Sequence, residues 1–111
     1  MKINEIIEGY WYSEYTPQYP MPIRDQLTDE QAKEIYDLII EKEKLSKEVF
    51  CKGSSHSRID GTIVGSSTYY FRLNDYNYRV WPNGFAEHYV LKYKVKPTDD
   101  FLKFIGYTSV V

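Results

Sequence analysis

Cysteine is nearly absent from this chain, which has one, Cys51, in 111 residues. A single thiol cannot form an internal disulfide, and this scarcity fits a reducing compartment. Long apolar runs are missing too: the longest, such as residues 38–40, fall far short of the roughly 20 residues that cross a bilayer. The N-terminal segment has no apolar core of a secretory signal. These absences predict a soluble, cytoplasmic protein.

An excess of basic residues is also lacking, because the net charge is −2 and the pI is about 5.7. Non-specific binding of nucleic acid or of an anionic membrane depends on a basic surface, so both are disfavoured. The length indicates one domain, residues 1–111. An apolar fraction of 42% is enough for a core without disulfides or a metal. We therefore expect no cofactor and no metal.

Tyrosine is the compositional excess, with 12 residues. An AT-rich genome would produce it, since tyrosine codons are AT-rich. A recognition surface would also use it, because tyrosine supplies large, rigid and amphipathic contact area. The two explanations are compatible. Many of these rings lie in an aromatic segment, residues 1–23, whose three prolines between positions 17 and 22 predict an extended arm. A helical turn is expected near its start, at residues 3–7.

The clearest predicted helix covers residues 28–46. Thr28 and Gln31 form a capping-box pattern, and Asp29 and Glu30 suit the positive first turn. An antiparallel β-meander is expected over residues 48–81. Its strands are predicted at 49–51, 62–64, 68–73 and 76–80, with residues 53–55 ending the first of them.

Two short helices are predicted within residues 84–106. Trp81, Pro82 and Gly84 form a stop signal, after which a helix is expected from about Phe85 to Lys94. Thr98 is expected to cap the second, and Gly106 to end it. The whole pattern predicts a single α+β domain. In it, the N-terminal helix packs on a three- to four-stranded antiparallel sheet, and two short C-terminal helices follow.

The second half of the chain carries the motifs SRIDG, WPxGF, HYV, VxP and FLxFI, between Ser57 and Ile105. This pattern resembles a family of small bacterial and phage proteins of uncharacterised function. The family usually has CRxC at Ser57–Asp60 and a histidine at Tyr93, and with His88 these residues suggest a zinc site. The resemblance implies a fold but no activity. Since serine and tyrosine are poor zinc ligands, we predict no zinc here.

Candidate catalytic residues are few. His88 is interpreted as a structural imidazole bonded to the backbone beside Trp81, with a small hydrolase built around it as the weaker alternative. Cys51 and His56 are near enough in sequence for a thiol–base pair, but the Gly-Ser-Ser segment between them fixes no geometry. A lone cysteine ending a strand is more typical of a small buried hydrophobe. We therefore predict no catalytic residue.

Binding is the function class that these features favour. We predict a small protein that acts through protein–protein contact, of the inhibitor, immunity or phage anti-defence type. The alternative is a ligand- or nucleic-acid-binding module, if the arginines of the β-region line one face with Tyr69 and Tyr78. A homodimer is also left open. The candidate surface residues are Tyr12, Tyr15, Tyr19, Arg58, Arg72, Tyr78, Arg79 and His88.

Overall fold

The capping box at Thr28 starts the longest helix of the domain, as the sequence predicts. The computed structural model describes residues 3–108, apart from the side chains of residues 51 and 52, so the interpretation of the Cys51 thiol lies outside the described residues. Helix α1 (Asp29–Lys44) begins where the Thr28 hydroxyl accepts from the Gln31 backbone and the Gln31 side chain accepts from the Thr28 backbone. It ends two residues before the predicted boundary.

A single sheet contains the strands of the domain. They are β1 (Asn4–Ile7), β2 (Lys47–His56), β3 (Ile63–Arg72) and β4 (Asn77–Pro82), in the order β1-β4-β3-β2. The predicted antiparallel meander is confirmed for β2, β3 and β4. The helical turn expected at residues 3–7 is wrong, because this segment is strand β1 and lies parallel to β4. The sheet is therefore mixed. A short apolar run cannot by itself distinguish a helical turn from a strand.

Strands β2 and β3 run further than the sequence indicates. Residues 53–55 were expected to end the first strand, but they lie within β2 and pass through a shift of register between Phe50 and Ser55. The two separate strands expected over residues 62–73 form one continuous β3. A bulge accommodates an extra residue while the strand continues, so glycine and serine here bend the strand without ending it.

The C-terminal helices follow the predicted positions, with one difference of type. The segment η1 (Phe85–Lys92) is a π-helix, in which the Tyr93 N–H reaches back to the His88 carbonyl. Gly84 precedes it with φ of 91°, and a Cβ there would lie 2.4 Å from the Val64 carbonyl oxygen. Helix α2 (Asp99–Ile105) is capped by the Thr98 hydroxyl and ends at Gly106 in the left-handed conformation.

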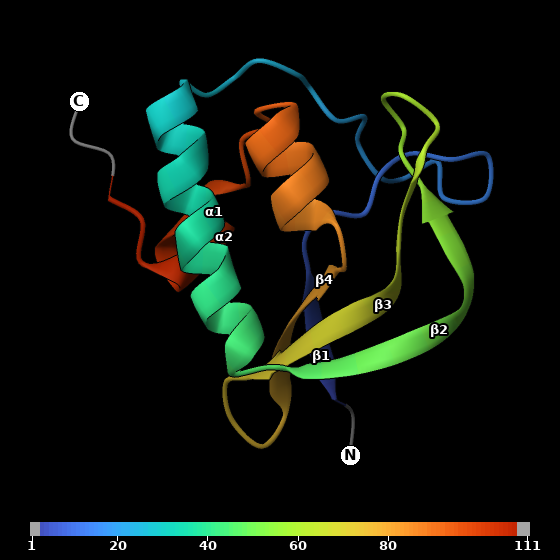
Figure 1. The fold of residues 1–111 in the computed structure, drawn as a ribbon. Helices are drawn as coiled ribbons and strands as arrows, with labels where there is room; N and C mark the ends of the chain where they lie inside the picture. The colour runs from blue at the N-terminus through green and yellow to red at the C-terminus, as the bar shows by residue number, and fades with distance from the viewer. Residues whose placement is uncertain (1–2, 109–111) are drawn as a thin grey trace.

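The helices lie on one side of the sheet, where α1 is beside η1 and α2 is behind α1 (Figure 1). Helix α1 contacts η1, α2 and β3. The expectation that α1 packs on the sheet is thus correct only in part, because the other helices provide much of its contact. No helix among the described residues is both long and apolar enough to cross a membrane.

Trp81 lies at the centre of the core, fully buried on β4. Its ring stacks on Tyr69 with centroids 6.0 Å apart and meets Phe101 edge-on at 5.6 Å. Its indole Nε1–H donates to the Glu43 carboxylate of α1 at 3.0 Å. One side chain therefore joins two strands and two helices, as expected for the residue that begins the stop signal.

Replacing this side chain should destabilise the whole domain. We expect Trp81→Ala to lower the free energy of unfolding by about 3–5 kcal/mol, because it leaves a large cavity. Urea denaturation measures the change, with Trp81→Phe as a milder companion that keeps part of the ring packing. A variant that keeps its melting temperature but loses partner binding would instead identify Trp81 as a functional residue.

Glu43 gives the stability a dependence on pH. Its pKa is raised from 4.5 to about 7, chiefly by burial and also by nearby Glu87 and Glu48, while the Trp81 bond opposes the rise. The folded state therefore holds this proton more tightly than the unfolded chain, and the penalty of ionising Glu43 grows as pH rises from 4.5 to 7. We expect Glu43→Gln, whose amide oxygen still accepts from Trp81, to stabilise the protein at pH 8 by on the order of 1–3 kcal/mol.

At pH 4 the same substitution should change little, because Glu43 is then protonated in both states. Chemical denaturation of both proteins at pH 4, 6 and 8 checks this trend. A stability difference that does not vary with pH would contradict the raised pKa.

Candidate functional site

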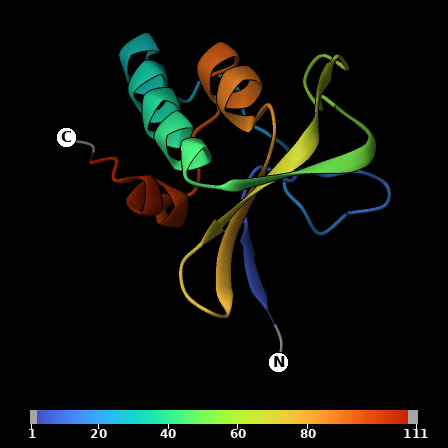
Figure 2. The ribbon, with the colours of Figure 1, turned by 60° about the horizontal axis from the view of Figure 1, so that its bottom comes forward.

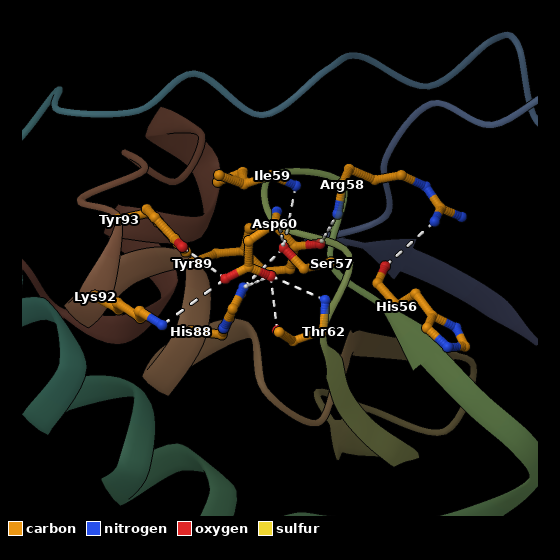
Figure 3. A network of polar contacts seen from close by, with 10 residues as sticks. All are labelled: His56, Ser57, Arg58, Ile59, Asp60, Thr62, His88, Tyr89, Lys92 and Tyr93. Carbon is orange, nitrogen blue, oxygen red and sulfur yellow. Dashed lines mark hydrogen bonds and ion pairs between the residues drawn. The ribbon is translucent and has the colours of Figure 1, made fainter.

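Ser57, on the loop that follows β2, is the centre of a polar network (Figure 3). Its hydroxyl oxygen accepts the backbone N–H groups of Ile59 at 3.0 Å and Asp60 at 3.2 Å. The same hydroxyl lies 2.7 Å from Nε2 of His88 on η1. Because Ser57 is only 4% exposed, these bonds hold the loop against the helix in a nearly water-free position.

Asp60 is the anionic member of the network. Its carboxylate accepts from the Thr62 hydroxyl at 2.6 Å, from the Thr62 backbone at 3.0 Å and from the Tyr93 hydroxyl at 2.6 Å. The Thr62 and Tyr93 bonds hold the pKa of Asp60 well below its usual range, and the Tyr93 pKa is raised, chiefly by the same bond. The Lys92 ammonium lies 3.8 Å from Asp60 Oδ2, the oxygen that also accepts from Tyr93. Asp60 is therefore ionised at neutral pH.

His88 is neutral in this setting. Burial lowers its pKa below 6.5, and Lys92 lowers it further, although Asp60 opposes the shift. Since Ser57 already accepts two backbone N–H groups, its own proton is free to donate to Nε2 of the neutral imidazole. The partner of His88 is thus a side chain, not the backbone group that the sequence analysis expected.

The arrangement differs from a catalytic relay. In a serine–histidine–aspartate relay, the hydroxyl and the carboxylate approach opposite ring nitrogens. Here the Asp60 carboxylate lies 3.5 Å from Nε2, the same nitrogen that contacts Ser57. Ser57 is also buried and does not line the shallow hollow beside His88. The geometry supports a structural role for these groups.

Arg58 connects the network to the N-terminal arm. Its backbone N–H donates to the Tyr89 hydroxyl at 3.0 Å, which fixes it beside η1. Its guanidinium donates to the carbonyl of Tyr12 at 3.0 Å and to that of His56 at 3.2 Å. The candidate residues Arg58, His88 and Tyr12 are therefore joined through one continuous set of contacts.

The arm forms an ordered turn over residues 10–20, here called the arm loop. The Ser13 hydroxyl accepts from the backbone of Tyr15 and Thr16, and the Thr16 side chain donates to the Trp11 carbonyl. The Tyr12 N–H donates to the Pro20 carbonyl and closes the loop. The Trp11 ring packs on Tyr89 at 5.4 Å between centroids. The arm is thus fixed to the domain both by its backbone and by one partly buried ring.

The tyrosines of the arm loop differ in exposure. Tyr15 is 86% exposed at the tip and Tyr12 is 44% exposed. Tyr19 is partly buried and packs against Tyr10 at 6.2 Å. The hollow beneath the loop has a volume of about 220 Å³, which is smaller than typical small-molecule sites. The loop therefore offers protruding rings more than a cavity.

The remaining candidate residues are not brought together. Arg72 lies opposite Tyr78 on one face of the sheet, whereas Arg79 lies opposite Phe71 on the other. The Arg79 guanidinium stands over the Phe104 ring, 5.4 Å from its centroid. The expectation that the arginines line one face with Tyr69 and Tyr78 is wrong, because alternation along β3 and β4 separates them.

That Ser57, Asp60, His88 and Tyr93 stand at the cysteine and histidine positions of the resembling family stays a prediction. From the sequence, Ser57, Asp60 and Tyr93 are interpreted as replaced zinc ligands and His88 as a structural imidazole, and the hydrogen bonds among them are not predicted. The Asp60-Gly61-Thr62 turn had a local signal, because aspartate commonly bonds the backbone two residues on. The Ser57–His88 bond joins residues 31 positions apart, so no local sequence pattern predicts it. Among the described side chains, no group of three or more His, Cys, Asp and Glu residues could hold a metal.

Removing the Ser57 hydroxyl should test the network directly. We expect Ser57→Ala to lower the free energy of unfolding by about 2 kcal/mol, because two backbone N–H groups and the partly buried His88 imidazole lose the hydroxyl that they contact. Urea denaturation at pH 7.5 measures this loss. Ser54→Ala, at an exposed position of β2, is the matched control and should change little. Equal stabilities of the two variants would contradict the network's structural role.

Comparison with known proteins gives no relative from which to transfer a function: no family model, curated protein or solved structure matches this chain. Its function is therefore inferred from the exposure, charge and contacts of its own residues.

Proposed function

We propose that this chain is a small cytoplasmic binding protein that acts by contacting another protein. The type is that of an inhibitor, an immunity protein or a phage anti-defence protein. The arm loop is its recognition surface, with Tyr15 and Tyr12 as the anchoring side chains. The observation that carries the proposal is the exposure of these rings, 86% and 44%, on a backbone fixed by hydrogen bonds.

A fixed backbone matters because ordering a loop during association costs free energy. The Ser13 hydroxyl and the Tyr12–Pro20 bond already hold the loop in one conformation. Tyrosine has few rotatable bonds and a large ring, so its burial in a partner costs little additional entropy. Exposed tyrosines on a preorganised loop are thus favourable anchors.

The polar network supports this surface from behind. Arg58 holds the Tyr12 carbonyl, and its neighbour Ser57 is bonded to His88. We further propose that the chain shares the fold of the family it resembles, with the hydrogen bonds among Ser57, Asp60, His88 and Tyr93 replacing a metal centre. In this proposal the network sets the position of the arm loop, and no substituted residue takes part in chemistry.

Binding of nucleic acid is the less favoured function. The net charge of −2 gives no general attraction to phosphates. Arg72 and Arg79 lie on opposite faces of the sheet, so they cannot both contact the phosphates of one nucleic-acid strand on the same face. The Arg72 guanidinium also pairs with Asp75, which reduces its charge.

Single alanine substitutions test the proposal. We expect Tyr15→Ala and Tyr12→Ala each to weaken capture of the partner by about 30-fold, the effect of losing roughly 2 kcal/mol at an interface hot spot. Affinity purification from the native host with mass spectrometry identifies the partner, and titration of the purified pair gives the affinities. Melting temperatures should remain close to that of the wild type.

Tyr76→Ala is the matched control, because Tyr76 is as exposed as Tyr12, at 44%, but lies in the β3–β4 turn. It should leave capture unchanged. The proposal fails if all three variants capture equally well, or if the arm variants lose stability and never bind a partner in their folded state.

A further inference from the structure

The face of the sheet that points away from the helices carries its own apolar surface. The register places Ile7 beside Val80 and Val80 beside Tyr70 on this face. Val49 follows on β2, opposite Thr68. None of the helices covers this side (Figure 2). The face is therefore a second surface, distinct from the arm loop.

Apolar side chains on this face remain accessible to solvent. At the two outer strands, Ile3 is 60% exposed and Ile7 and Val49 are each 38% exposed, whereas Val80 on β4 is only 2% exposed. A hollow of about 280 Å³ lies on this face, lined by Ile3, Glu5, Lys47, Val49, Tyr70 and Tyr78. Contiguous apolar groups rimmed by charged ones are typical of association surfaces.

The two charges beside the hollow lie at opposite borders of the sheet. Glu5 is on β1 and Lys47 is on β2, and these are the outer strands. Three strand spacings separate them, about 14 Å in total. Neither forms an ion pair with a described residue. The face thus has Glu5 at one border and Lys47 at the other, with Arg72, which pairs with Asp75, on the inner strand β3 between them.

We propose that a second copy of this chain covers the face, with the two sheets packed against each other. A two-fold axis parallel to the strands exchanges the borders, so that β1 of each copy lies over β2 of the other. Glu5 then approaches Lys47 of the partner copy, twice in the dimer. The register places Glu5 and Lys47 two residues apart along the strand direction, about 7 Å, and a lysine side chain can span this distance.

Self-complementarity is the reason to expect a second copy in this place. A two-fold interface uses the same patch on both subunits, so the patch must match itself. Opposite charges on opposite borders satisfy this condition, and the exposed apolar side chains at β1 face Val49 on β2 of the partner copy. The two sheets would lie about 10 Å apart, as in other face-to-face packings.

Reversal of the two charges tests the dimer in the full-length protein. Sedimentation velocity over a concentration series should give a wild-type dissociation constant on the order of 1–100 μM. Glu5→Lys and Lys47→Glu should each weaken it at least tenfold, because symmetry places two repulsive pairs in the interface. The double variant Glu5→Lys/Lys47→Glu should recover most of the wild-type affinity. Glu41→Lys, exposed on α1, is the control and should have no effect.

Circular dichroism confirms that each variant is folded. Recovery in the double variant supports the exchanged borders, since a general effect on folding would not be reversed by a second substitution. A wild-type protein that is monomeric throughout the series overturns the proposal. So does a dimer that both single variants leave intact, because another face would then form it. A double variant as weak as the single ones would also reject the pairing.

Discussion

Burial of the Trp81 indole is the constraint on which the rest of this structure depends. The ring is fully buried, and its one polar atom must therefore find a partner inside the protein. Glu43 provides it, at the cost of a carboxylate whose pKa rises to about 7. The last turn of α1 is thus positioned over β4. Phe101 meets the same ring edge-on and positions α2.

After Trp81, the chain enters η1 through a turn at Gly84 that few residue types can form. Gly84 has φ of 91° and lies so close to the Val64 carbonyl that no side chain fits. This turn sets the start of η1 and hence the direction of His88. The bond from His88 to Ser57 fixes the loop before β3, and Arg58 then holds the arm. Core packing therefore determines, through a series of contacts, where the exposed tyrosines lie.

Local signals explain which parts could be predicted from the sequence. The caps at Thr28 and Thr98 use bonds within four residues, so both helix starts are found by inspection. Strand β1 depends on its pairing with β4, more than 70 positions away in the chain, and an isolated run of isoleucines does not specify it. The same holds for the polar network, whose members come from two separate segments. The spacing of Arg72 and Arg79 along the chain does not show that they lie on opposite faces of the sheet. That assignment depends on the register between β3 and β4.

The charge states in the network clarify what it contributes. Asp60 is ionised and His88 is neutral, so their approach at 3.5 Å is no strong ion pair. Hydrogen bonds to Thr62, Tyr93 and Ser57 satisfy both groups instead. Such bonds hold a loop with modest free energy and have no requirement for a metal supply. The hydrogen bonds that hold the arm loop thus come from residues of this chain alone, which supports the proposal that its outward tyrosines contact a partner.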